Sequence, residues 1–225
     1  MSFTAGPASN ARAAAAEPDR DCPLCPRLVE FRSANRALEP AWFNAPVPSF
    51  GNPSPRLLIV GLAPGLKGAN RTGRPFTGDY AGDLLYSTLL AFGFARGRYD
   101  ADPGDGLELV DCMITNAVRC VPPQNKPTPS EIATCRAFLT GRLATLSALS
   151  AIMALGRIAH DSVVAAMGVK RSSFPFKHGA RHSLGVGPVL FDSFHCSRYN
   201  TNTGRLTTEM FHDVVRSIRT HIDQS

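Results

Sequence analysis

From residue 56 onward, the chain alternates short apolar runs with segments of helical periodicity. The apolar runs occupy residues 56–61, 109–118, 151–155 and 188–194, and helical spacing appears at residues 84–92 and 210–218. A third helix is predicted to begin at Pro129, because Thr128 and Glu131 form a capping box around it. This alternation is typical of a largely parallel sheet with helices on both faces. We therefore predict an α/β fold built as one α/β/α sandwich.

The length of 225 residues favours one large domain over two. We expect residues 1–20 to be a disordered tail and residues 21–225 to be the domain. The tail lacks a cationic start followed by an apolar core, so we expect a cytoplasmic protein. No apolar run approaches the ~20 residues that cross a bilayer, so we expect no membrane contact.

Three loops follow predicted strands, and in open parallel sheets ligands bind where such loops converge. Their composition is unusual. They span residues 62–79, 116–128 and 195–205. The first is rich in glycine, which lets backbone N–H groups approach a ligand, but it lacks the Gly-Lys-Ser/Thr of a Walker loop.

Four residues in or beside these loops are candidates for chemistry. Phe76 either anchors its loop in the core or stacks on a planar base. Asp79 either caps the next helix or presents a carboxylate to water. Asn116 either forms a turn or reads the edge of a pyrimidine, and His195 at a strand end is placed to hydrogen-bond an oxyanion.

Six cysteines in a chain without a secretory signal favour metal or thiol roles over disulfides. Cys22 and Cys25 are three residues apart, and Cys120 and Cys135 are separated by 14 residues. Two close pairs would be typical of a zinc ribbon, so the wide second pair favours an iron–sulfur cluster. The alternative is a redox pair at Cys22 and Cys25 with two buried cysteines. Cys112, within an apolar run, is predicted to lie in the core.

The formal net charge is +6, which favours polyanionic partners. Residues 170–182 contain Lys170, Arg171, Lys177 and Arg181 and no acidic residue. Arg198 and Arg205 lie in an Asn- and Thr-rich run that resembles a phosphate-contacting surface. The alternative for the 170–182 segment is a solvated loop without a partner.

Together, GLAPG with GANRTGRPFTGD, TNAVRCVPP with NKPTP, and FHCSRYNTNTGRLT resemble the uracil-DNA glycosylase superfamily. The resemblance is to its family 5, the type b enzymes, which are related to the family 4 iron–sulfur enzymes. It covers roughly residues 20–222. It implies a central sheet of four parallel strands, hydrolysis of the N-glycosidic bond of a flipped-out deaminated base, and a role in base excision repair.

The resemblance also implies roles for individual residues. Asp79 corresponds to the carboxylate that orients or activates water, Phe76 to the ring that stacks on the base, and Asn116 to the amide that reads its edge. His195 corresponds to the donor to uracil O2. Gly61 and Ala63 join the base-binding set. From the basic residues of the loops and of the 170–182 segment, and not from the resemblance, we predict a DNA-binding set of Arg71, Lys170, Arg171, Lys177, Arg198 and Arg205. The cluster implied is a 4Fe–4S cluster held by Cys22, Cys25, Cys120 and Cys135.

Two positions depart from the type b pattern. Gly65 stands where Ala is common, which enlarges the space near the base, and Cys196 replaces the proline of His-Pro-Ser. Lys67, the one lysine of the first loop, is not marked as a nucleophile, so we expect a monofunctional enzyme without strand cleavage. We also expect a monomer that acts on DNA containing uracil or other deaminated bases. The alternatives are a catalytically silent iron–sulfur module that binds damaged DNA and an iron–sulfur electron-transfer protein. If Asp79 does not position the water molecule, Asp83, one helical turn further along the chain, is the alternative candidate for that role.

Overall fold

The computed structural model describes residues 16–185 and 187–225. Its centre is a sheet in the order β1-β5-β2-β6-β8-β7. The four inner strands run parallel and are buried throughout: β2 (Leu57–Gly61), β5 (Cys112–Asn116), β6 (Ala151–Leu155) and β8 (Val189–Ser193). Strands buried on both faces read as continuous apolar runs, so the predicted four-stranded parallel sheet is confirmed.

Two short antiparallel strands extend this sheet beyond the prediction. They are β1 (Phe50–Gly51), which pairs with β5, and β7 (Arg181–Ser183), which pairs with β8. A separate ribbon consists of β3 (Ala95–Arg96) and β4 (Glu108–Leu109). Strands of two or three residues carry too little side-chain alternation to be recognised from sequence.

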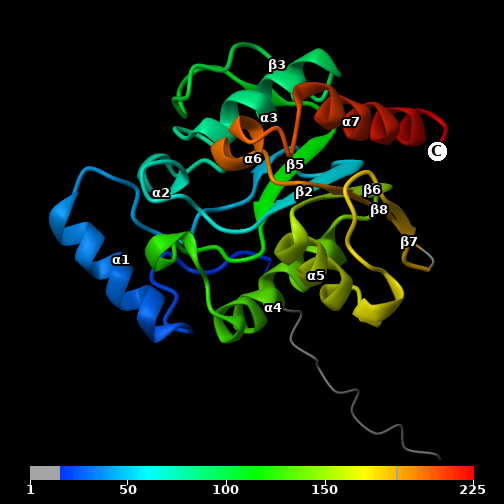
Figure 1. Ribbon diagram of the computed structural model, residues 1–225. Coiled ribbons are helices and arrows are strands. Elements are labelled where there is room, and N and C mark those ends of the chain that lie inside the picture. Colours follow the sequence, from blue (N-terminus) through cyan, green and yellow to red (C-terminus); the bar gives the residue numbers. More distant parts are fainter. Residues whose placement is uncertain (1–15, 186) are drawn as a thin grey trace, which may run out of the picture.

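Helices cover both faces of the sheet (Figure 1). On one face, α3 (Tyr80–Ala91) and α7 (Thr208–Asp223) pack against Leu57, Ile59 and other side chains of that face. On the other, α4 (Pro129–Thr145) and α5 (Arg157–Ala166) pack against Leu58 and Val60. The predicted three-layer sandwich is therefore confirmed. The remaining helical elements are α1 (Pro26–Leu38), α2 (Ala69–Thr72), η1 (Pro123–Asn125), η2 (Arg171–Ser173) and α6 (Arg198–Asn202).

The capping box of α4 has the predicted form and also fixes a second helix. Thr128 Oγ1 accepts a hydrogen bond from the Glu131 N–H, and the Glu131 carboxylate accepts one from the Thr128 N–H. The same carboxylate accepts two hydrogen bonds from Arg27 of α1, at 2.7 and 2.8 Å. These bonds tie the start of α1 to the start of α4. Of the predicted cysteine ligands, Cys25 is the N-cap residue of α1 and Cys135 lies within α4.

Most of the predicted tail, residues 1–15, lies outside the described residues, and the boundary at residue 20 stays a prediction. Glu17 forms ion pairs with Arg119 and Arg142 and accepts a hydrogen bond from the Ser49 N–H. Within the described residues, no helix is long and apolar enough to cross a membrane.

Candidate active site and cysteine site

A cavity of about 360 Å³ lies where the parallel strands end, and we call it the principal cavity because all four chemical candidates line it. Cavities of this size suit small planar ligands. Phe76, Asp79, Asn116 and His195, the four chemical candidates, all line it. The other lining residues are Leu62, Ala63, Pro64, Gly65, Ala69, Tyr80, Ala81, Asn125, Ser197 and Arg198.

Gly61 allows two of these side chains to meet. It is the last residue of β2 and is paired in register with Asn116, the last residue of β5. A Cβ on Gly61 would lie 2.5 Å from Asn116 Oδ1 and 2.6 Å from Phe76 Cζ. Gly61 therefore acts by leaving space for both side chains, and it is not among the residues that line the cavity.

Phe76 adopts an unusual backbone conformation, with φ of 54°. Tyr99 donates a hydrogen bond to the Phe76 carbonyl at 3.2 Å, and Tyr86 donates one to the Pro75 carbonyl at 2.6 Å. Left-handed φ is costly for a bulky residue and persists where its surroundings impose it. The two tyrosines thus hold the Phe76 ring at the cavity wall.

Arg74 connects this loop to a distant segment. Its buried guanidinium pairs with both oxygens of Asp105, at 2.8 and 2.7 Å, and its Nε donates to Thr77 Oγ1 at 2.7 Å. Phe50, Tyr86 and Tyr99 surround the guanidinium. The Arg74 hydrogen bonds hold the pKa of Asp105 well below its usual range. Sequence reasoning missed this pair, because it joins residues 31 positions apart.

Asp79 occupies the N-cap position of α3 but makes no side-chain capping hydrogen bond. Its Oδ1 is buried with no hydrogen-bond partner among the described residues. Burial raises the pKa of Asp79, and the negative charge of Asp83 raises it further. Because a Cβ on Gly68 would lie 2.5 Å from Asp79 Oδ2, glycine at that position lets the backbone approach the carboxylate. An unpartnered buried carboxylate oxygen needs a ligand such as water.

His195 follows β8, and its carbonyl accepts a hydrogen bond from Asn200 Nδ2 at 2.8 Å. Burial lowers the pKa of His195 to about 4, so the imidazole is neutral at physiological pH. Next to it, Cys196 is fully buried and its thiol donates to the Ala81 carbonyl of α3 at 3.4 Å. Cys196, one of the two positions that depart from the type b pattern, therefore links the loop that carries His195 to α3, the helix that begins after Asp79.

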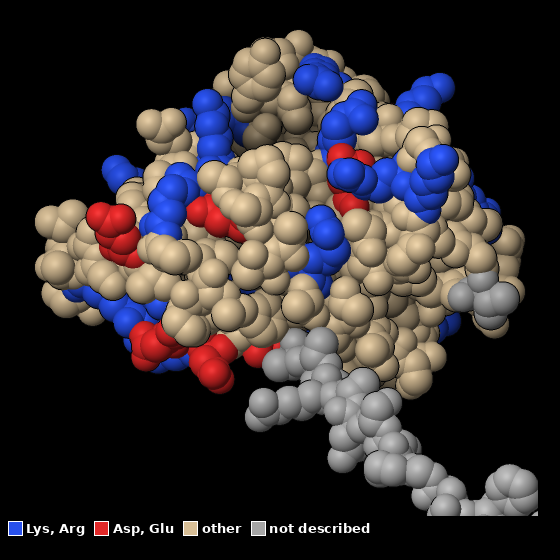
Figure 2. Space-filling view, turned by 90° about the horizontal axis from the view of Figure 1, so that it is seen from below, with Lys and Arg blue, Asp and Glu red and all other residues tan. Residues whose placement is uncertain are grey.

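The predicted basic residues divide into two groups. Arg198 lines the principal cavity with its guanidinium over Tyr80, and Lys177 and Arg205 line a neighbouring depression beside His195. Arg71 instead lines a separate depression with Trp42 and Phe43. Lys170 and Arg171 are exposed at η2. Arg181 lies in β7, and its Nη2 is 3.1 Å from His221 Nδ1. The face in Figure 2 carries more Lys and Arg than Asp and Glu side chains.

The four predicted cysteine ligands line one small cavity between α1, the loop after β5, and α4. Arg32 donates to Cys120 Sγ at 3.7 Å, and the Arg119 N–H donates to Cys135 Sγ at 3.3 Å. Burial raises the pKa of Cys120 to about 11 and that of Cys135 to about 12. By contrast, Cys112 is buried in the sheet core, as predicted.

The spacing of these thiols distinguishes between metal groups. In the described part of the chain, no three of the four Sγ atoms lie within 4.8 Å of one another. Thiolates on one tetrahedral zinc, with Zn–S near 2.3 Å, would be roughly 3.8 Å apart. The wider arrangement fits a multi-iron cluster better, and the buried guanidiniums of Arg32 and Arg119 supply positive charge beside the thiolates.

Comparisons with known proteins agree with the family resemblance seen in the sequence. Residues 48–219 match the family described as the Uracil DNA glycosylase superfamily. The chain is 48% identical over 200 residues to a type-5 uracil-DNA glycosylase of Thermus thermophilus, covering 86% of this chain and 90% of that protein. It is 42% identical over 207 residues to the type-5 uracil-DNA glycosylase of Mycobacterium tuberculosis, covering 88% and 77%. A type-4 uracil-DNA glycosylase of Pyrobaculum aerophilum is 35% identical over 150 residues, covering 66% and 62%.

Proposed function

The chain belongs to the uracil-DNA glycosylase superfamily, with its strongest similarity to the type-5 enzymes, and from this premise we propose how its cavity works. The protein is a uracil-DNA glycosylase, a hydrolase of N-glycosyl bonds in base excision repair. The observation that carries the mechanism is the convergence of Asp79, Asn116, Phe76 and His195 on one cavity. The resemblance seen in the sequence is confirmed.

A base inside a duplex is out of reach, so the uridine nucleotide must be flipped into the cavity. Phe76 supplies an aromatic face for the uracil ring. Asn116, whose amide both donates and accepts hydrogen bonds, is placed to read the polar edge of the base. Gly61 keeps these two groups close enough to act on one ring.

Breaking the glycosidic bond places negative charge on the departing base. His195, as a neutral imidazole, donates its N–H toward uracil O2, where that charge develops. A neutral imidazole suits this role, because it still carries an N–H donor and does not change its charge near neutral pH. The low pKa that burial gives His195 supports this assignment.

The sugar develops positive charge in the same step, and a water molecule must then attack C1′. The Asp79 carboxylate favours the cation and accepts a hydrogen bond from the water. Its unpartnered Oδ1 is the buried acceptor that such a water needs. Lys67 is exposed and does not line the cavity, which supports a monofunctional enzyme without a Schiff base.

The cysteine site fits a 4Fe–4S cluster held by Cys22, Cys25, Cys120 and Cys135. Such a cluster, when bound, would cross-link α1, the loop after β5, and α4. The loop after β5 carries Cys120 and continues to Asn125 at the wall of the principal cavity. We therefore assign the four cysteines a structural role in supporting the active site.

Lys177, Arg198 and Arg205 are our proposed phosphate contacts, since Arg198 lines the cavity and Lys177 and Arg205 line the neighbouring depression beside His195. The proposed substrate range includes hypoxanthine or other deaminated bases as well as uracil. We also retain the predicted monomer and the predicted cytoplasmic location.

A single-turnover assay on a uracil-containing oligonucleotide tests this proposal. The wild-type protein should release uracil and leave an abasic strand that breaks only with heat or alkali. Asp79→Ala should lower the rate by ~10²- to 10⁴-fold while retaining affinity for abasic DNA. Asp213→Asn, an exposed acid on α7, is the control and should match wild type. DNA binding without excision by wild type would instead support the catalytically silent module.

A further inference from the structure

Phe194 immediately precedes His195 and is held by two basic side chains. Its N–H donates to His178 Nδ1 at 3.1 Å, and its ring is stacked on the His178 imidazole with centroids 4.9 Å apart and planes 13° apart. The Arg205 guanidinium also lies over the Phe194 ring, 4.6 Å from its centroid. His178 thus contacts both the main chain and the side chain of the residue before the uracil O2 donor.

The hydrogen bond fixes the protonation state of His178. An N–H donor needs a lone pair on Nδ1, so the imidazole must be neutral with its proton on Nε2. Burial lowers the pKa of His178, which favours this neutral form.

Asp192 of β8 holds the segment that carries His178 on both sides. Its carboxylate accepts a hydrogen bond from the Lys177 N–H at 3.3 Å, and its carbonyl accepts one from the Gly179 N–H at 2.9 Å. Its own N–H donates to the Ala180 carbonyl at 3.0 Å. Since Asp192 lies only three residues before His195, the same strand anchors His178 and leads into the catalytic loop.

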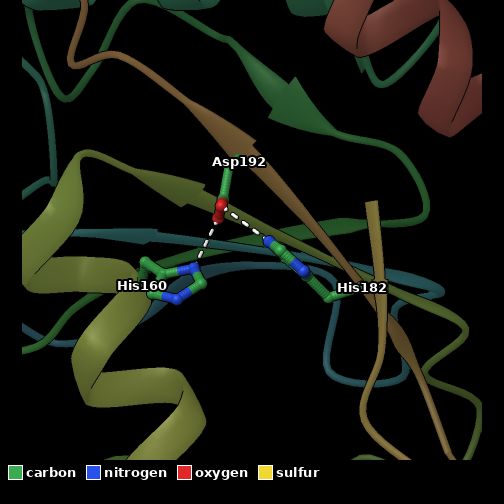
Figure 3. Close-up of side chains that lie close together, drawn as sticks. All are labelled: His160, His182 and Asp192. Atoms are coloured by element: carbon green, nitrogen blue, oxygen red, sulfur yellow. Dashed lines mark hydrogen bonds and ion pairs between the residues drawn. The ribbon is translucent and has the colours of Figure 1, made fainter. Parts of the chain in front are cut away.

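Two further histidines point at the Asp192 carboxylate (Figure 3). His160 Nδ1 lies 2.7 Å from Oδ1 and His182 Nε2 lies 3.0 Å from Oδ2. His160 Nε2 lies 2.7 Å from the Phe174 carbonyl and must donate to it. Both ring nitrogens of His160 therefore lie within hydrogen-bond distance of an oxygen atom, so the ring is held from two sides. Burial alone would lower the pKa of His160, but Asp192, together with the Phe174 carbonyl and the charge of Asp161, raises it above its usual value.

The ligand atoms of His160, His182 and Asp192 lie within 4.8 Å of one another, which also suits a metal ion. The hydrogen bonds of this cluster fix the segment between Phe174 and His182 against β8.

We propose that His178 is a positioning residue for catalysis, which sets the backbone at Phe194 and so aims the His195 imidazole at the base. Asp192, with His160 and His182, holds His178 in place. This inference rests on the proposed role of His195. It differs from the phosphate-binding role predicted for the surrounding basic segment, because it assigns His178 a contact within the protein.

Three substitutions separate the hydrogen bond from the ring stacking. In His178→Asn, Oδ1 occupies the position of Nδ1 and still accepts from the Phe194 N–H. In His178→Gln the acceptor lies one bond further out, and His178→Phe keeps a ring without an acceptor. His212→Phe is the matched control, since His212 also packs against a phenylalanine, Phe92, but outside the principal cavity.

We expect single-turnover uracil excision at saturating enzyme to fall at least tenfold in His178→Gln and His178→Phe. His178→Asn should stay within about threefold of wild type, His212→Phe should match wild type, and affinity for abasic DNA should change little in any of them. Equal losses in all three His178 variants, or losses confined to DNA affinity, would overturn the proposal.

Hydrogen exchange of the Phe194 amide tests the contact without an activity assay. Exchange should be faster in His178→Gln and His178→Phe than in His178→Asn and wild type. Unchanged exchange in all variants would show that the contact does not hold the backbone and would overturn the inference. Failure of wild type to excise uracil would instead count against the proposed function.

Discussion

The ring of Phe76 is stacked against the imidazole of His195, with centroids 5.9 Å apart and planes inclined by 30°. These residues come from loops after β2 and β8, which are separated in the sheet by β6. The group expected to stack on the base therefore contacts the group expected to stabilise its charge. A change in the position of Phe76 should affect base binding and chemistry together.

Gly61→Ala tests this coupling. The new Cβ would meet Asn116 Oδ1 and Phe76 Cζ at 2.5 and 2.6 Å, so both side chains must move. A displacement near 1 Å at a reacting site can cost ~10²-fold, and we expect a loss of about that size in single-turnover excision. Gly65→Ala is the comparison, because its Cβ meets only Asp79 Oδ2, at 3.1 Å, and should cost less than about tenfold. Near-normal excision by Gly61→Ala would contradict the proposed geometry.

The pH dependence of excision should reflect Asp79. The carboxylate is the active form and burial raises its pKa, so the rate should rise as pH increases through that raised pKa and then level off. His195 remains neutral above about pH 4.

Asp83→Asn removes a negative charge that raises the pKa of Asp79, so the acid limb should move to lower pH. Glu209→Gln, an exposed acid on α7, should leave the limb unchanged. Single-turnover rates measured across the acid pH range give the comparison. If the acid limb of Asp83→Asn lay at the same pH as that of wild type, the limb could not be assigned to Asp79.

The parallel sheet and the strand-end candidates were predictable because their signals are local. Fully buried strands appear as apolar runs, and Asn116 and His195 stand directly where such runs end. The Arg74–Asp105 pair and the His178–Phe194 hydrogen bond depend on segments that meet only in the folded chain.

The contact made by His178 could not be predicted from the sequence. In the sequence it lies among Lys170, Arg171, Lys177 and Arg181, and the composition of that segment indicates phosphate binding. Only the fold reveals that the main chain around it is hydrogen-bonded to Asp192 and that its Nδ1 faces the Phe194 N–H.

The cysteine site gives a spectroscopic prediction. Cys120→Ala should abolish the visible thiolate-to-iron absorption of purified protein and lower its iron and sulfide content. Cys112→Ala is the matched control, since Cys112 is buried in the sheet core and does not line the cysteine cavity, so the absorption should survive. Equal loss in both variants would exclude the assigned ligand set.

The proposed phosphate contacts should appear in the salt dependence of binding. Neutralising Lys177 and Arg205 together should reduce the slope of log affinity against log salt by about two. The control, Arg96→Gln with Arg98→Gln, removes the same charge from residues paired with Glu108 and Asp100. If both double variants changed the slope equally, net charge rather than contact at these positions would explain the effect.

His195 should matter most for the poorest leaving group. A base that carries negative charge well needs little help from a hydrogen-bond donor, whereas uracil needs more. His195→Ala should therefore lose more excision rate on uracil than on 5-fluorouracil in the same DNA. Asp79→Ala should lose a similar factor on both substrates, because its carboxylate acts on the sugar and the water. The ratio of the two single-turnover rates in each variant makes this comparison independent of protein concentration. An equal loss on both bases in His195→Ala would mean that His195 does not stabilise the leaving group.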